Sequence, residues 1–396
     1  MINNETCDNH REVNTLDQML IIENTLKKYQ FLWDKEPIDY YPNLPSNTLG
    51  FIGELQNYSS EELIELENLN AKAKTPLLSE LFKDLKDSLL RINQLKQEAR
   101  INQNELRGLS LKKCHEIKRL IPILEELSPT LIHDIGSGKA PLSFLMAQRN
   151  LEMQFKCYDL DKTLQTSAIK KNQNNMALKR INFIHQTISS KSQLDLKDRE
   201  LLFGLHACGD LSIDLIKILI KEGNDLFNIP CCFHKQTKQN LSGHQSLKLN
   251  KFALTLANRG QINITPKALS IRNEYKTYRY ALQMIYFNKY QKLIMSLGNA
   301  HKSWYQLSFH DYVKKYDQDL FYLDNLNKSF YALKKTINDY LLIEVIRNPI
   351  GRLLEHYLLL DRVLYLEKNN FKVELIELFN NELSPKNIAL KATKSI

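Results

Sequence analysis

The segment Leu-Ile-His-Asp-Ile-Gly-Ser-Gly-Lys, residues 131–139, gives the clearest indication of the fold. A short apolar run ends at Asp134 and continues into a Gly-x-Gly turn, and a helical pattern follows from Pro141 to Gln148. Glycine allows the sharp turn and the close approach of the backbone to a ligand that a nucleotide-binding β–α–β unit needs. The segment therefore predicts a Rossmann-like strand–turn–helix with a ligand at the turn.

Three classes of ligand compete for such a turn. A P-loop has a glycine five residues before its Gly-Lys pair and a Ser or Thr after it, but these positions hold His133 and Ala140. A dinucleotide site expects a third glycine where Pro141 stands. The remaining interpretation is the acid-x-Gly-x-Gly loop of S-adenosylmethionine (SAM) methyltransferases, in which Asp134 holds the amino end of the methionine. Ala140 stands where that loop usually has a third glycine, which is a mild departure from its pattern.

The second predicted strand supports this interpretation. Residues 154–158 form a short run of mostly apolar residues that ends at Asp159. An acid at the end of the second strand, about twenty residues past the glycines, commonly accepts hydrogen bonds from the ribose hydroxyls. Asp159 is therefore the expected ribose ligand. Asp161 has a simpler interpretation, as the cap of the helix that starts near Thr163.

Length and composition indicate a globular protein. The chain has 396 residues, of which 43% are hydrophobic and 25% charged, and its net charge is +9. The positive excess fits an anionic partner such as RNA and fits a solvated lysine surface equally well. Residues 1–13 show no apolar segment of signal-peptide type, and no run approaches a membrane span. Six scattered cysteines, two of them adjacent, argue against a disulfide framework and favour a cytoplasmic location.

The segments after the glycine loop alternate between strand-like and helix-like patterns. The further strands are expected at residues 181–184, 201–206 and 225–232. A helix at 212–221 separates the last two, and a basic helix at 110–127, capped by Ser110, leads into the first strand. This alternation predicts the α/β class with a doubly wound, mostly parallel sheet.

The rest of the chain is expected to add helices and one hairpin to this sheet. Helical patterns cover residues 11–33, 59–70 and 77–104, then 247–258, 275–295, 308–319, 327–345 and 353–366. Two alternating runs, 371–379 and 387–392, predict the antiparallel hairpin with which a methyltransferase sheet ends. The predicted organisation is a helical N-terminal region (1–105), a SAM-binding core (106–244), a helical insertion (245–345) and a segment that completes the core (346–396).

Two polar clusters fall where the fourth and fifth strands end, at residues 204–212 and 231–235. Ligands of open α/β sheets bind at the carboxyl ends of the strands. His206, Asp210 and His234 are therefore candidates for positioning the methyl acceptor or removing its proton. The simpler interpretations are that Asp210 or Ser212 caps the next helix and that His206 is a buried structural histidine.

The same clusters contain residue types that zinc prefers, His206, Cys208, Cys231, Cys232 and His234. Adjacent residues of a strand point to opposite faces, so Cys231 and Cys232 are not expected to share one ion. The spacing also lacks a Cys-x-x-Cys pair. The sequence therefore predicts no metal site.

Taken together, these motifs resemble the methyltransferase-like protein 25 family. The resemblance rests on Gly-Leu-His-Ala-Cys-Gly-Asp-Leu-Ser (204–212), Cys-Cys-Phe-His-Lys (231–235), Leu-Ser-Leu-Lys-Lys-Cys-His-Glu (109–116), Leu-Leu-Leu-Asp-Arg-Val-Leu-Tyr-Leu (358–366) and Leu-Ser-Pro-Lys-Asn (383–387). It runs from about residue 105 to the end. A tRNA 2′-O-methyltransferase family with Cys-Cys-His-His is more distantly similar, but Phe233 replaces its first histidine, so that substrate does not carry over safely.

The resemblance implies a Rossmann-like class I methyltransferase that uses SAM. The expected cofactor contacts are Asp134, Gly136, Ser137, Gly138, Lys139, Asp159, Gln186, His206 and Ala207. The expected acceptor is a macromolecule, with RNA favoured over protein, because Lys112, Lys113, Lys118 and Arg119 offer phosphate contacts or, equally, a solvated helix face. The alternative function is a SAM-binding scaffold that has lost catalysis and acts through protein partners.

Overall fold

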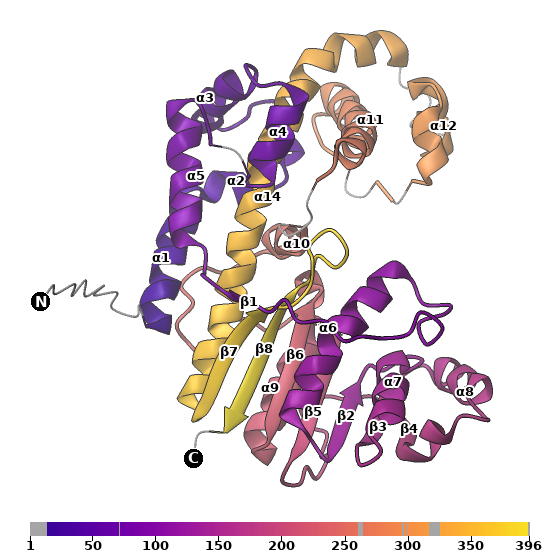
Figure 1. The fold of residues 1–396 in the computed structure, drawn as a ribbon. Helices are drawn as coiled ribbons and strands as arrows, with labels where there is room; N and C mark the ends of the chain where they lie inside the picture. The colour runs from indigo at the N-terminus through magenta and orange to yellow at the C-terminus, as the bar shows by residue number, and fades with distance from the viewer. Residues whose placement is uncertain are drawn as a thin grey trace, which may run out of the picture.

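The computed structural model describes residues 14–70, 72–259, 264–294, 297–298, 300–316 and 325–394. An eight-stranded sheet with the order β1-β7-β8-β6-β5-β2-β3-β4 forms its centre (Figure 1). The strands are β1 (Asn93–Gln94), β2 (Leu131–Ile135), β3 (Gln154–Asp159), β4 (Ile181–His185), β5 (Glu200–Cys208), β6 (Asp225–Cys231), β7 (Phe371–Glu377) and β8 (Ile388–Lys394). Only β8 runs antiparallel to its neighbours, β6 and β7. The predicted parallel sheet with a C-terminal antiparallel hairpin is confirmed.

Helices cover both faces of this sheet. α6 (Leu111–Leu127) and α7 (Pro141–Arg149) pack on one face, and α9 (Asp210–Glu222) and the end of α14 (Leu326–Lys368) pack on the other (Figure 1). Alternate residues of β5 serve the two faces, because Phe203 joins the first buried cluster and Leu202 the second. α8 (Lys162–Lys171) and the short η2 (Met176–Arg180) lie between β3 and β4 in the chain.

The N-terminal region packs against α14 as a bundle of helices. Its elements are α1 (Thr15–Lys28), α2 (Gln30–Trp33), η1 (Pro37–Tyr40), α3 (Ser46–Leu55), α4 (Ser60–Glu67) and α5 (Pro76–Ser88). A capping box starts α4, with Ser59 and Glu62 bonding to each other's backbone. Leu26, Leu81 and Leu85 are fully buried against Leu353 and Leu354 of α14.

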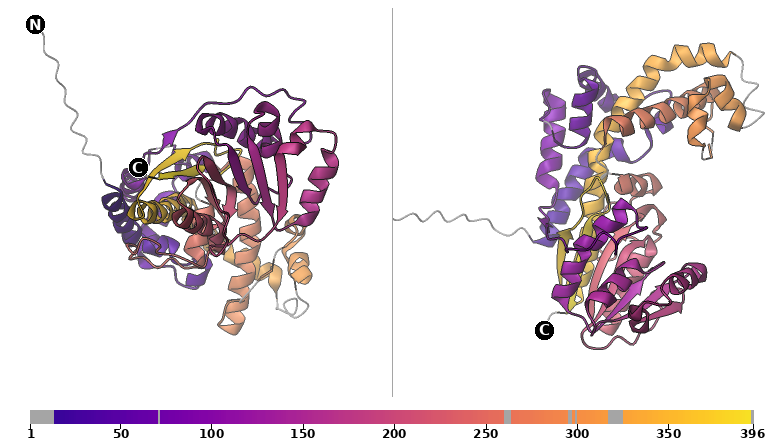
Figure 2. Two further views of the ribbon diagram at one scale, coloured as in Figure 1. Left: turned by 90° about the horizontal axis from the view of Figure 1, so that it is seen from below. Right: turned by 45° about the vertical axis from the view of Figure 1, so that its right-hand side comes forward.

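The inserted segment contributes a second group of helices. These are α10 (Lys251–Arg259), α11 (Pro266–Tyr290), η4 (Lys302–Gln306) and α12 (Phe309–Tyr316), and the short η3 (Phe233–Lys235) precedes them. α11, α12 and the start of α14 project away from the sheet, as two further views show (Figure 2). α10 instead packs against η3, at the end of β6. The insertion therefore reaches the carboxyl edge of the sheet through α10.

Several predicted helix boundaries are wrong. The helix expected over 77–104 ends at Ser88, because the chain becomes extended at Leu89 and β1 then pairs with β7. The helix expected over 11–33 is interrupted at Tyr29, and its first three residues lie outside the described part of the chain, as do residues 1–10 and 317–319. The helices expected at 327–345 and 353–366 are one helix, which continues through Pro349.

This single helix also crosses the expected boundary between residues 345 and 346. Both halves of α14 are buried, Ile343 and Ile346 on one side of Pro349 and Leu353 and Leu354 on the other. Packing along the whole length therefore offsets the local cost of a proline inside a helix. Among the described helices, none is both long and apolar enough to cross a membrane.

Candidate active site at the carboxyl ends of the strands

The glycine loop forms a tight turn between β2 and α7. The backbone N–H groups of Gly136 and Ser137 both donate to the Tyr158 carbonyl, at 2.9 and 3.1 Å. Gly136 and Gly138 have φ angles of +75° and +58°, and Ala140 takes the same left-handed conformation at +49°. Among the described residues other than its chain neighbours, no atom lies within 4 Å of the position that a Cβ on Gly136 would occupy. The turn therefore leaves open space beside bare backbone, as close approach of a ligand requires.

Asp134 lies at the base of this loop, and its side chain is buried. Its carboxylate accepts a hydrogen bond of 2.6 Å from the Ser143 hydroxyl on α7. Burial raises the pKa of Asp134 to about 6, although the Ser143 hydroxyl and the Lys113 ammonium act in the opposite direction. A buried carboxyl in this condition is well suited to a cationic ligand group, which would restore its ionised form.

Asp159 connects the two loops that a nucleoside would touch. Its carboxylate accepts one bond of 2.7 Å from the Gly138 N–H and one of 2.8 Å from the Asp161 N–H. Asp161 itself caps α8, as expected, by accepting from the Thr163 N–H at 2.8 Å. Gln186 is exposed beside them, and its N–H donates to the Asp159 carbonyl at 3.3 Å. Lys139 is also exposed.

His206 pairs with a buried acid that the sequence did not single out. The Nε2 atom of His206 lies 2.6 Å from the carboxylate of Glu116 on α6. Burial by itself would raise the pKa of Glu116, but the His206 contact and the Lys113 ammonium bring that pKa down to about 2. Because an ionised carboxylate can only accept, Nε2 carries the proton and Nδ1 is left with the basic lone pair. A carboxylate–imidazole contact of this kind also occurs in general-base sites, so His206 stays a candidate for that role.

Three of the four basic residues of α6 that were expected to contact phosphates make contacts within the protein. Lys112 and Lys113 lie 3.6 and 3.3 Å from the Glu116 carboxylate. Arg119 is buried, and its Nε donates to the Leu378 carbonyl at 2.7 Å. These three side chains therefore support Glu116 and the C-terminal loop, and the prediction that they form phosphate contacts is wrong for Arg119.

Asp210 and Ser212 do not cap α9, so that prediction is wrong. Gly209 is the capping residue, with a φ angle of +56°. The Asp210 carboxylate instead accepts from the N–H and hydroxyl of Thr237, at 2.8 and 2.6 Å, and thereby holds the segment after η3. Ser212 is buried between Asn228 and Arg362, both of which donate to its hydroxyl.

His234 is exposed on η3, as the sequence suggested. Its Nδ1 is in close contact with the side-chain amide of Asn258 on α10. The other atom of that amide, Oδ1, accepts from the Phe233 N–H at 2.9 Å. Asn258 therefore orients His234 from the inserted segment, and no motif in the sequence pointed to it. Phe233 is fully buried, with Arg362 and Lys386 stacked on its ring.

The cysteines at the strand ends come together, contrary to the prediction for Cys231 and Cys232. Cys231 is the last residue of β6, but Cys232 lies beyond the strand with a φ angle of +52°. The sulfurs of both approach Cys208, at 3.0 and 3.3 Å. The contact between the two thiols lowers the pKa of Cys208 and raises the pKa of Cys231. The rule of alternating faces fails because the chain has already left the strand.

Two cavities adjoin α10 on the side of the insertion. The larger, of about 490 Å³, is lined by Arg259, Lys276 and Arg279 together with Tyr275, Tyr280 and Tyr305. The smaller, of about 180 Å³, shares Arg259, Tyr275 and Lys276. Lys276 is buried and paired with Glu344. Within the described ranges, neither arginine lies within ion-pair distance of a carboxylate. The Arg279 guanidinium donates to the Leu297 and Gly298 carbonyls and to the Tyr316 hydroxyl, so the exposed Arg259 is the cation best placed to meet a ligand beside the tyrosine rings.

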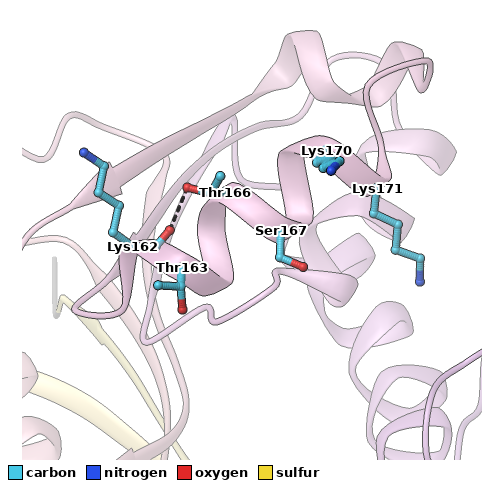
Figure 3. A pocket seen from close by; sticks show the side chains of 6 residues that line it. All are labelled: Lys162, Thr163, Thr166, Ser167, Lys170 and Lys171. Carbon is cyan, nitrogen blue, oxygen red and sulfur yellow. Dashed lines mark hydrogen bonds between the residues drawn. The ribbon is translucent and has the colours of Figure 1, made fainter.

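A third cavity, of about 660 Å³, runs along α8 (Figure 3). The side chains that line it are Lys162, Thr163, Thr166, Ser167, Lys170 and Lys171. They all belong to one helix, and the Thr166 hydroxyl donates to the Lys162 carbonyl of that helix at 2.9 Å. None of the expected site residues lines this cavity, so we assign it no chemistry.

A family model covers the segment that carries these residues. Residues 112–239 match the model of a family described as a methyltransferase domain. Among solved structures, the chain is similar to the plantazolicin methyltransferase BpumL in complex with SAH, with 13% identity, 49% of this chain and 68% of that chain covered, and a TM-score of 0.23. It is also similar to coclaurine N-methyltransferase bound to N-methylheliamine and SAH, with 11% identity, 96% and 94% covered, and a TM-score of 0.28.

The matched segment contains the glycine loop, both acids at the ends of β2 and β3, and the strand ends that carry His206 and His234. The sheet has the mostly parallel order with a C-terminal antiparallel hairpin that this class of enzyme uses. The chain is therefore a SAM-dependent methyltransferase with a Rossmann-like fold.

Proposed function

We propose that this methyltransferase acts on a macromolecular acceptor, with RNA favoured over protein, and that it is a relative of the methyltransferase-like protein 25 family. The observation that carries the proposal is the cavity lined by Arg259, Arg279 and three tyrosines. This cavity adjoins α10, whose Asn258 contacts His234. Guanidinium groups contact phosphates, and tyrosine rings stack on unpaired bases. A single-stranded RNA segment could therefore bind there and extend toward the strand ends.

In this proposal the cofactor lies across the glycine loop. Asp134 holds the ammonium group of the methionine part, and Asp159 accepts from the two ribose hydroxyls. Gly136, Ser137, Gly138 and Lys139 border the space that the sulfonium chain occupies. Gln186, His206 and Ala207 complete the pocket. Both acids adjoin the glycine loop: Asp134 precedes it in the chain, and the Asp159 carboxylate accepts a hydrogen bond from the Gly138 N–H.

SAM affinity should depend on pH through Asp134. Because its pKa is about 6 in the folded protein, Asp134 is largely neutral below that pH and attracts the SAM ammonium weakly. The Kd for SAM should fall as pH rises from 5 to 7, by up to about tenfold per unit below the pKa, and then level off. Calorimetric titration at constant ionic strength measures this. Asp134→Asn should flatten the curve; a slope of the same size in that variant would assign the effect to a histidine instead.

The chemistry needs a nucleophile in line with the sulfonium methyl group and a base for its proton. The acceptor oxygen or nitrogen attacks the methyl carbon, the carbon–sulfur bond breaks, and S-adenosylhomocysteine leaves. We assign the base to His206, whose Nδ1 is freed by the Glu116 contact. His234 and Asp210 remain further candidates. His234 contacts α10, on the side where the acceptor is proposed to bind, and Asp210 holds the segment after η3 through Thr237.

The acceptor class can be tested directly. The purified full-length protein is incubated with tritiated SAM and, separately, with total RNA and total protein from cells. Label in the RNA fraction is the expected result, and label only in protein would end the RNA proposal. If SAM binds in calorimetry but neither fraction is labelled, the alternative of a SAM-binding scaffold gains support. The reduced cysteines that we expect of a cytoplasmic protein require that a thiol reductant be present throughout.

Arg259→Ala should weaken RNA binding without affecting SAM binding. Arg259 is exposed at the end of α10, so its removal should leave the fold intact. Loss of one phosphate contact should lower the slope of log K against log salt by about 0.7 for single-stranded RNA. Fluorescence anisotropy with a labelled oligoribonucleotide at several salt concentrations measures the slope. Lys372→Ala is the control. It removes an exposed cation on β7, beside the edge strand β1, and should leave the slope unchanged.

A further inference from the structure

Three cysteine side chains gather at the carboxyl edge of the sheet, outside the groups that the methyl-transfer proposal uses. Cys208 ends β5, Cys231 ends β6, and Cys232 follows directly. The three sulfurs all lie within 4.8 Å of one another. Cys208 is exposed and Cys232 half-buried, so the cluster faces outward. Three of the five cysteines in the described part of the chain therefore meet at one point.

The fold brings these sulfurs together by two local departures from regular strand geometry, at His206 and at Cys232. A bulge at His206, with a φ angle of +60°, shifts the register so that Cys208 stands level with Cys231. If His206 instead paired regularly with Pro230, Cys208 would stand level with Cys232, and its side chain would point to the face opposite that of Cys231. The left-handed conformation of Cys232 then turns its own sulfur back toward Cys208.

Gly209 closes the arrangement. Its N–H donates to the Cys231 carbonyl at 2.9 Å, and a Cβ at this position would lie 2.8 Å from the Cβ of Lys235 and 3.0 Å from its backbone. The Cys231 sulfur is held in turn by a contact of 3.2 Å with the His206 carbonyl. The sulfurs are therefore positioned by backbone on both sides, rather than by the flexibility of their side chains.

We propose that Cys208, Cys231 and Cys232 bind one thiophilic divalent cation, such as zinc. Thiolate sulfur is the preferred donor of zinc, and sulfurs around a tetrahedral zinc lie about 3.8 Å apart. The sulfur pairs at 3.0 and 3.3 Å need to separate by less than about 1 Å to reach that spacing. In the described residues no fourth His, Cys, Asp or Glu completes the set. The fourth position is therefore open on the exposed side, as in reactive rather than structural zinc sites.

The third sulfur argues for a cation over a simple thiol pair. A disulfide between Cys208 and Cys231 would use two sulfurs and leave out the Cys232 sulfur, which also approaches Cys208. An ion uses all three. This inference is independent of the acceptor, because the binding of an ion can be measured without any methyl transfer.

The experiment uses Co²⁺ as a spectroscopic probe of the full-length protein. The protein is reduced, stripped with a chelator and titrated with Co²⁺ under nitrogen. We expect one equivalent to bind with the intense near-ultraviolet absorption of thiolate-to-cobalt charge transfer, and Zn²⁺ to abolish that absorption. Cys208→Ser and Cys232→Ser should each remove most of it. Cys114→Ser is the matched control, because Cys114 is half-buried on α6, its thiol donates to the Leu106 and Leu109 carbonyls, and it lies outside the cluster.

Far-ultraviolet circular dichroism and SAM binding of each variant confirm that it is folded. The proposal is overturned if the reduced wild-type protein shows no thiolate absorption with Co²⁺, or if the absorption survives in Cys208→Ser. It is also overturned if Cys114→Ser loses the absorption as fully as the cluster variants. Mass spectrometry that finds only a Cys208–Cys231 disulfide, with no ion bound after reduction, would assign the cluster to thiol redox chemistry instead.

Discussion

His206→Ala should lower the rate of methyl transfer by roughly 10²–10⁴-fold, the usual contribution of a general base. The imidazole is the group at the strand ends whose proton position is fixed by an ionised carboxylate, Glu116, at 2.6 Å. Removal of the ring leaves the acceptor without a base but keeps the glycine loop and both acids of the cofactor site. The measurement is the single-turnover rate of tritium transfer from saturating SAM to bulk cellular RNA.

Loss of activity by misfolding is separated by a second variant. His206→Gln can still donate to Glu116, so the buried carboxylate keeps a partner, yet an amide cannot take a proton. We expect the same loss of rate with an unchanged melting temperature. Glu116→Gln should lose less, because the imidazole remains but its tautomer is no longer fixed by a charge. Full activity in His206→Gln, with loss in His234→Ala, would transfer the role of base to His234.

Asp159→Ala should weaken SAM binding by about 2–3 kcal/mol, which is roughly 30- to 150-fold in Kd. Hydrogen bonds to a charged acceptor are the strong ones, and a ribose offers two hydroxyls to this carboxylate. The substitution also removes the acceptor of the Gly138 N–H, so the glycine loop loses its tie to β3. Isothermal titration with SAM measures the affinity without any need for an acceptor.

Asp161→Ala is the matched control for that experiment. It removes the same charge two residues away and deletes the α8 cap, but it touches neither the loop nor the expected ribose position. Its Kd for SAM should stay within a few-fold of the wild-type value. Equal losses in the two variants would show that net charge near β3, rather than a contact of Asp159, governs affinity.

Local sequence was sufficient for the part of the site that one strand–turn–helix unit builds. The loop after β2 and the acid after β3 need only the positive φ angles of two glycines and a carboxylate at a strand end, and both features are visible in a window of ten residues. The same is true of the Asp161 and Ser59 caps. Each of these features can be recognised from residues close together in the chain, although the Gly138–Asp159 contact then joins two such segments.

The rest of the site depends on contacts that no local pattern contains. Glu116 looks like one acid among lysines on an exposed helix, and only the packing of α6 on β5 turns it toward His206. Asn258 lies 24 residues after His234 in a segment with no recognised motif. The helix expected over 77–104 failed because Leu95 pairs with Glu377, 282 positions away in the sequence, and that pairing outweighs helix propensity.

The continuity of α14 has a mechanical consequence. Its 43 residues, at about 1.5 Å each, make a strut of about 65 Å. Its C-terminal end lies behind the sheet of the SAM-binding core, and Glu344, near its middle, lines the smaller of the two cavities beside α10. A residue inserted near Asn348 would rotate one end against the other by about 100°. In the proposed arrangement this one helix sets the spacing between the cofactor sheet and the cavities beside α10, so the loops around the helix can vary in length more freely than the helix itself.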